Sequence, residues 1–276
     1  MSNFAKLDHD FSYWQKQTQP LFADLIWNLP EQKTGTVTII GGNSQNFSSP
    51  IHLGEFINQH LPFRTTKILL PDALRTKVPP VPDFIFSPST TSGSFAKSAI
   101  LPDYLTNSDV NIFIGDLSKN SATAIALAET LEQSLSNPNH QNHLTILARD
   151  SVDLLAPEAG RWLLFPEICL VTSMVQLQKV FRATYYPKMI MLSQPLIPII
   201  ETLHKFTLTY PITILTFHQE QIIVAQHGNI VTTPIIDTDY SPISLWSGQL
   251  AARIAALNFF NPKHRLEATS AAILYK

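Results

Sequence analysis

The sequence predicts an α/β protein, a three-layer sandwich in which a mainly parallel sheet is covered by helices on both faces. Short β-branched runs alternate with helical segments through the middle of the chain, which is the pattern of βαβ units. Near the C-terminus, two further β-branched runs are joined by His227-Gly228-Asn229, a combination typical of a hairpin. We therefore expect an antiparallel C-terminal hairpin at one edge of the sheet.

The expected elements follow in chain order. Residues 8–29 carry aromatic and aliphatic side chains at roughly helical spacing and predict an N-terminal helical extension over 1–30. Strands are predicted in 34–42, 65–71, 110–116, 143–150 and 167–172, and three short β runs in 212–233. Helices are predicted in 50–61, 121–135, 173–183, 187–206 with a proline kink, 247–258 and 264–275. No repeat or linker divides the chain, so we expect a single domain over 1–276.

Composition excludes several classes of function. The net charge is −2 and the basic residues are scattered singly, which argues against binding to nucleic acid. No apolar run approaches the ~20 residues of a membrane helix, and the N-terminus lacks the apolar core of a signal peptide. We therefore expect a cytoplasmic protein without a membrane partner. Cys169 is the one cysteine of the 276 residues, and its apolar surroundings predict a core residue.

The candidate ligand-binding loops follow the strands, because ligands of open α/β sheets gather beyond the carboxyl ends of the strands. Gly41, Gly42 and Asn43 follow the first strand, where their amides either face a ligand or form a tight turn. After later strands come Gly115-Asp116 and Asp150, whose carboxylates serve either a metal bound to phosphate or a helix cap. Neither the dinucleotide fingerprint nor the P-loop motif is present, and no histidine spacing predicts a metal site.

A fourth loop, Trp246-Ser247-Gly248, runs directly into an Ala-rich helix. The first N–H groups of a helix lack internal partners, so such a turn can hold an anion. Trp246 either stacks on a base or packs in the core. The residue at the mouth is Gln249, where a reaction would usually need a carboxylate.

Taken in order, these segments resemble the NAD(P)H-hydrate dehydratase family of the ribokinase-like superfamily, from about Lys33 to the end of the chain. "TVTIIGGNSQNFSSP" is similar to the family's strand and Gly-Gly-Ser loop, and "VNIFIGDLSKNSAT" falls where the family has a Gly-Pro-Gly-Leu-Gly loop. "ILARDSVDLL" is close to the family's "DADALNLL" strand end, and "LWSGQLAARIAALNFF" matches its G-x-G-D loop and helix.

The resemblance implies a ribokinase-like fold and use of ADP or ATP, with Mg²⁺, to dehydrate hydrated NADH or NADPH. It implies that the nucleotide lies near the G-x-G-D helix, whose Asp acts as the base. The implied binding residues are Gly41, Gly42, Asn43, Gly115, Lys119, Asp150, Trp246, Ser247 and Gly248. The resemblance also implies that the protein is a homo-oligomer.

The sequence departs from the family pattern at most chemical positions. Gln249 stands where the family has its Asp, Thr216-Phe217 where it has Lys-Gly, and Met174 where it has His. Asp116 and Lys119 are the residues that would replace the lost acid and the lost positive charge. We therefore expect a small-molecule-binding protein with reduced or lost activity. The alternatives are a non-catalytic binding or assembly module on the same fold and a small-molecule kinase.

Overall fold

The computed structural model describes residues 11–17, 22–27, 29–98, 101–137, 143–235 and 247–274. Its strands are β1 Trp14–Lys16, β2 Thr34–Ile40, β3 Phe63–Pro71, β4 Phe84–Ser87, β5 Val110–Phe113, β6 Leu144–Ala148, β7 Ile168–Val171, β8 Thr213–His218, β9 Gln221–Gln226 and β10 Asn229–Pro234. Its α-helices are α1 Ala23–Trp27, α2 Ser48–His60, α3 Leu101–Thr106, α4 Ser121–Leu135, α5 Asp150–Leu155, α6 Ala159–Trp162, α7 Met174–Ala183, α8 Leu196–Thr209, α10 Gln249–Phe260 and α11 Arg265–Ala271. Two short 3-10 helices lie at Asp72–Leu74 and Ala156–Glu158.

The described strands form one ten-stranded sheet in the order β1-β10-β9-β8-β7-β6-β5-β2-β3-β4. Neighbouring strands from β8 to β4 pair in parallel. The predicted C-terminal hairpin is confirmed, because β9 pairs antiparallel with both β8 and β10. The carboxyl ends of β7, β6, β5 and β2 therefore lie side by side at one edge of the sheet.

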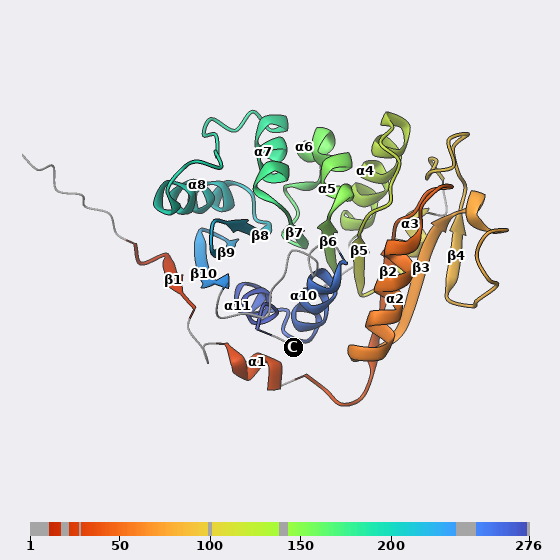
Figure 1. Ribbon diagram of the computed structural model, residues 1–276, viewed down its shortest axis with the longest axis horizontal. Coiled ribbons are helices and arrows are strands. Elements are labelled where there is room, and N and C mark those ends of the chain that lie inside the picture. Colours follow the sequence, from red (N-terminus) through yellow and green to blue (C-terminus); the bar gives the residue numbers. More distant parts are fainter. Residues whose placement is uncertain are drawn as a thin grey trace, which may run out of the picture.

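Helices cover both faces of the sheet and make three layers (Figure 1). Side chains on each strand point alternately to the two faces, so Ile40 packs in one core and Ile39 in the other. The first core contains residues of α4 to α8, and the second contains residues of α2, α10 and α11. The predicted α/β class with a buried, mainly parallel sheet is confirmed.

The N-terminal segment differs from the predicted helical extension. Trp14–Lys16 is a strand that pairs in parallel with Ile230–Thr232 of β10, and helix is found only at α1 among the described residues of 1–30. The edge of β10 offers unpaired backbone groups, which this segment satisfies. The Trp14 Nε1–H group also donates to Thr232 Oγ1 at 3.0 Å. Backbone pairing at a sheet edge, which side-chain spacing does not report, therefore decides the structure here.

The predicted proline-kinked helix over 187–206 is also wrong in its first part. Helix α8 begins at Leu196, directly after Pro195, and Pro198 lies in its first turn. Proline is tolerated there because the first helical N–H groups have no internal acceptor. The preceding residues form a loop that is tied to the body of the protein through its carbonyls. Gln178 Nε2 donates to the Ile190 oxygen, and His218 Nε2 lies 2.8 Å from the Gln194 oxygen.

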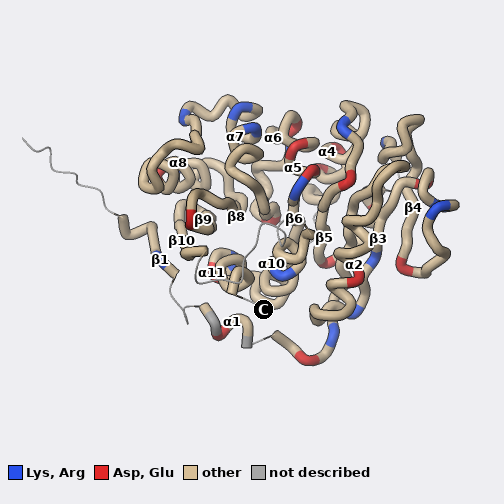
Figure 2. Tube along the Cα trace, in the orientation of Figure 1, with Lys and Arg blue, Asp and Glu red and all other residues tan. Residues whose placement is uncertain are grey.

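Cys169 lies in β7 and is 1% exposed, as predicted for a core residue. Burial raises the pKa of its thiol to about 12, because the low-polarity interior disfavours the thiolate. Within the described parts of the chain, no helix has both the length and the apolar character to cross a bilayer. Figure 2 shows Lys and Arg residues spread over many elements in this view, without a continuous basic stripe.

We expect Gly54→Val in α2 to destabilise the protein by roughly 1–3 kcal/mol, because it overfills a packed interface. A Cβ atom at Gly54 would lie 2.6 Å from Ile68 Cδ1, so either the Ile68 side chain or α2 would have to shift. Gly160→Ala is the control, since a Cβ atom there meets no atom within 4 Å. Thermal unfolding should show a Tm lowered by several degrees for Gly54→Val and an unchanged or higher Tm for Gly160→Ala. Equal Tm values for Gly54→Val and the wild type would contradict this packing.

Candidate functional site

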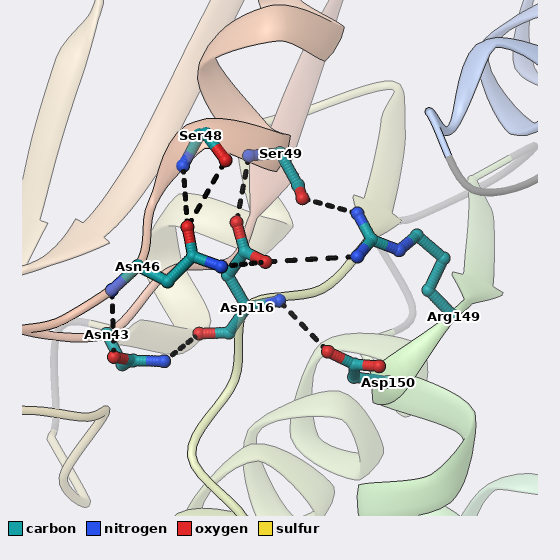
Figure 3. Close-up of polar contacts among 7 residues, drawn as sticks. All are labelled: Asn43, Asn46, Ser48, Ser49, Asp116, Arg149 and Asp150. Atoms are coloured by element: carbon teal, nitrogen blue, oxygen red, sulfur yellow. Dashed lines mark hydrogen bonds and ion pairs between the residues drawn. The ribbon is translucent and has the colours of Figure 1, made fainter. Parts of the chain in front are cut away.

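The carboxyl edge of the sheet brings together loops that are far apart in the sequence. Figure 3 shows residues from the loop after β2, the start of α2, the end of β5 and the start of α5 in mutual contact. Asp116 lies at the centre of this group, and Arg149 reaches it from the end of β6. The parallel strand order places these four segments together, so the predicted convergence of loops at this edge is observed.

The glycine loop after β2 uses its backbone amides within the chain. The N–H groups of Gly41, Gly42, Asn43 and Ser44 donate to the carbonyls of Leu69, Gly115, Asn46 and Gly93, at 3.4, 3.0, 2.8 and 2.8 Å. Each glycine is needed for a different reason. A Cβ atom at Gly41 would lie 2.7 Å from the Gly115 oxygen, and Gly42 has a φ of +88°, which residues other than glycine rarely adopt. The tight-turn interpretation of this loop therefore fits, and presentation of its amides to a ligand does not.

Asp116 caps a helix, but not the helix that follows it in sequence. Its Oδ2 accepts the backbone N–H of Ser49, in the first turn of α2, at 2.8 Å. Its Oδ1 accepts from Asn46 Nδ2 at 3.0 Å, and its backbone carbonyl accepts from Asn43 Nδ2. The side chain of Asp116 is only 3% exposed. The capping alternative for this residue therefore matches the structure, with α2 as the helix that is capped.

Arg149 is the residue of this site that the sequence interpretation missed. Its Nη2 lies 3.8 Å from Asp116 Oδ1, and its Nη1 donates to the Ser49 hydroxyl. The guanidinium lies over Gly115, where a Cβ atom would come within 3.2 Å of Arg149 Cζ. One feature of the sequence could have identified it: Arg149 is a basic residue at the end of a predicted buried strand, directly before the acid Asp150.

A pocket of about 220 Å³ opens beside Arg149 at the ends of β6 and β7. It is lined by Arg149, Asp153, Val171, Ser173, Val175, Gln176 and Lys179. Gln176 organises this pocket, because its Nε2 donates to the Arg149 carbonyl at 2.7 Å and to Asp153 Oδ2 at 2.8 Å. Lys179 Nζ pairs with Asp153 Oδ1. Two basic residues, Arg149 and Lys179, thus line the pocket, with Lys179 paired to Asp153 and the Arg149 carbonyl held by Gln176.

Asp150 contacts this cluster, and Lys119 lies three residues after Asp116 in the chain. Asp150 Oδ2 accepts the backbone N–H of Asp116 at 3.3 Å, which links the start of α5 to the end of β5. Lys119 is exposed in the loop between β5 and α4. Met174, at the position of the family's histidine, is buried in the core and directs no polar group into the pocket.

The C-terminal turn places Gly248, in the left-handed backbone region, directly before α10. Gly248 has a φ of +80°, and a Cβ atom there would lie 2.6 Å from Ile114 Cδ1, one residue before Gly115. Gln249 is the first residue of α10 and is half-buried, with its N–H 3.5 Å from Ser247 Oγ. The first turn of α10 holds no acidic residue. Trp246 lies outside the described residues.

Phe217, at the carboxyl end of β8, packs partly buried against the core between the sheet and α10, and Thr216 beside it is fully buried. In the part of the chain that the structure describes, no three His, Cys, Asp or Glu side chains are grouped as a metal site.

No family model matches this chain, and a search of curated proteins gave no significant match. Solved structures do match. A ribokinase-like superfamily protein from Enterococcus faecalis has a TM-score of 0.64 at 14% identity, over 97% of this chain and 87% of that chain. An ADP/ATP-dependent NAD(P)H-hydrate dehydratase from Bacillus subtilis, co-crystallised with ATP/Mg²⁺ and soaked with CoA, has a TM-score of 0.56 at 13% identity, over 92% and 84%. These likenesses show that the chain has the ribokinase-like fold.

Proposed function

We propose that this protein is a diverged relative of the NAD(P)H-hydrate dehydratases that binds an adenine nucleotide by its phosphates and has little or no turnover. The observation that carries the proposal is the start of α10. There the left-handed Gly248 turn is kept, while Gln249 stands in the first position of a turn without any acid. We therefore infer that this turn can bind phosphate without the acid that a reaction would need.

Three features support binding of phosphate. The first N–H groups of α10, a helix of 12 residues, lack internal acceptors and attract anions. Arg149 and Lys179 line a pocket at the ends of β6 and β7, and guanidinium matches phosphate geometry. The pocket of about 220 Å³ is smaller than the ~300 Å³ or more of most small-molecule sites, so it suits the phosphate end of a nucleotide.

The choice of an adenine nucleotide rests on the likeness to the Bacillus subtilis dehydratase, which was co-crystallised with ATP/Mg²⁺. Mg²⁺ bound with a nucleotide usually takes one or two protein carboxylates besides the phosphates. Asp153 lines the pocket and is the carboxylate that would contact such an ion.

The lack of a base limits turnover. The amide of Gln249 has no useful basicity near neutral pH. Asp116, the acid that would replace it, already accepts hydrogen bonds from Ser49 and Asn46 and faces Arg149. Loss of one general base typically costs about 10²–10⁴ in rate. The same loss counts against a small-molecule kinase, which needs an acceptor for the hydroxyl proton.

We expect ATP and ADP to raise the Tm of the wild-type protein, because a ligand that binds only the folded state stabilises it. Arg149→Met should weaken ATP binding by roughly 10-fold or more in calorimetry, since it removes a charged donor to phosphate. Lys119→Met is the matched comparison, because it removes an exposed cation from the neighbouring loop. A greater loss for Lys119→Met would place the phosphate over the β5–α4 loop instead, and no response to ATP or ADP would refute the proposal.

We expect Gln249→Asp to raise the slow hydrolysis of ATP by about 10²-fold, the lower end of what a general base contributes. Water accepts the phosphoryl group of ATP in this assay, so no second substrate is required. Gln249→Asn is the control, because it has the size of Asp without its basicity. A Gln249→Asp variant that binds ATP but hydrolyses it no faster than Gln249→Asn would show that the missing acid is not the limiting group.

A second candidate is a non-catalytic assembly module, and one segment of the surface favours it. Tyr185, Met189, Met191, Leu192 and Ile197, in and beside the loop between α7 and α8, are all exposed large apolar side chains. Exposed apolar side chains that occur together often mark a protein interface. The small-molecule site would then be secondary to self-association.

This second function predicts that light scattering gives a mass that is a multiple of the 30.9 kDa chain. Leu192→Lys should then yield the monomer, because it places a charge in the interface. Leu164→Lys is the control, since Leu164 is equally exposed but belongs to the turn before β7. A wild-type protein that stays monomeric at high concentration would exclude this candidate.

A further inference from the structure

We propose that Asp116 is a specificity-determining residue. Its carboxylate fills an anion site at the start of α2, so ligands cannot bind at the part of the carboxyl edge beside α2. The inference deepens the proposed function and rests on it for the ligand at the Arg149 pocket. Under this proposal the protein takes a ligand with one phosphate-bearing end and rejects a second anionic group beside it.

The donors around Asp116 form a receptor for an oxyanion. They are the Ser49 backbone N–H, the Asn46 side-chain amide and the Arg149 guanidinium, and they come from two separate segments (Figure 3). Backbone N–H, amide and guanidinium groups are the donors that bind carboxylate and phosphate alike. In this protein the anion that these donors bind is the Asp116 carboxylate, which belongs to the chain itself.

Helix α2 depends on this internal anion. Its N-cap residue, Phe47, makes no side-chain capping bond, and its first turn contains no acid. The Ser49 N–H is one of the groups that a helix cannot satisfy by itself. Asp116 supplies both the acceptor and the negative charge that favour the N-terminus of a helix.

The N–H groups of the glycine loop are likewise already occupied by acceptors within the chain. The amides of Gly41, Gly42, Asn43 and Ser44 all donate to backbone carbonyls, and the side-chain amide of Asn43 donates to the Asp116 carbonyl. The Asp116 side chain is 3% exposed, so a dissolved anion does not reach these donors. A phosphate brought next to it would meet occupied donors and a like charge.

Arg149 lies between the occupied anion site at α2 and the open pocket at the ends of β6 and β7. Its guanidinium contacts Ser49 and faces Asp116, while the residue also lines the pocket, where Gln176 holds its carbonyl. The site therefore offers phosphate contacts in the pocket and at α10, and none at α2. This arrangement fits a single nucleoside phosphate better than a dinucleotide spread across both sites.

The test uses inorganic phosphate as the probe and Asp116→Gly as the variant. Glycine suits this position because Asp116 has a φ of +60°. At constant ionic strength with chloride as the reference anion, calorimetry should find one more phosphate bound to Asp116→Gly than to the wild type. The Tm of the variant should also rise by roughly 5 °C or more at saturating phosphate.

Asp109→Gly is the matched control. The Asp109 carboxylate also accepts a backbone N–H, that of Thr36 at 2.7 Å, but it lies near the amino end of the strands, away from α2 and Arg149. Its removal should therefore leave the number of bound phosphates unchanged.

The outcomes separate the two proposals. No phosphate on the wild type and one on Asp116→Gly would refute the nucleotide pocket and keep the role of Asp116. Equal phosphate binding by Asp116→Gly and the wild type would overturn the role of Asp116. If Asp116→Gly does not fold in chloride, recovery of its circular dichroism spectrum in phosphate supports the role, and failure to recover contradicts it.

Discussion

Asp116 connects two segments that are far apart in the sequence, the start of α2 and the junction between β6 and α5. Through Ser49 it caps α2, and through Arg149 it fixes the end of β6. Its own backbone N–H is held by Asp150 at the start of α5. A buried carboxylate is stable only with such partners, since an unpaired charge in the interior costs several kcal/mol. The positions of α2, Arg149 and the glycine loop are therefore mutually dependent.

Packing of the fold and a reactive site place different demands on the sequence. Packing on the two faces of the sheet requires only apolar side chains of suitable size, and Ile39 and Ile40 supply them to opposite cores. Catalysis requires particular groups at particular atoms. At the start of α10 the turn is held by packing of Gly248 against Ile114, whereas Gln249 supplies no acid there.

Much of the fold could be predicted from the sequence where one signal dominates. The helix predicted at 121–135 matches α4 at both ends, because its alanines and leucines recur at helical spacing and Asn120 caps it. The hairpin at Gly228 was likewise predictable from its turn residues. In contrast, the strand at Trp14–Lys16 depends on the free edge of β10, more than 200 residues away in sequence. No local pattern reports such a pairing.

The sequence by itself determined the α/β class, the loops that meet at the carboxyl edge and the absence of an acid at position 249. These properties depend on residue type and on short-range periodicity. Only the tertiary structure decided that the glycine-loop amides are already bonded, that Asp116 caps α2, and that Arg149 faces Asp116. The physical reason is that hydrogen bonds between distant segments depend on where the strands place their ends, and that placement is a property of the whole sheet.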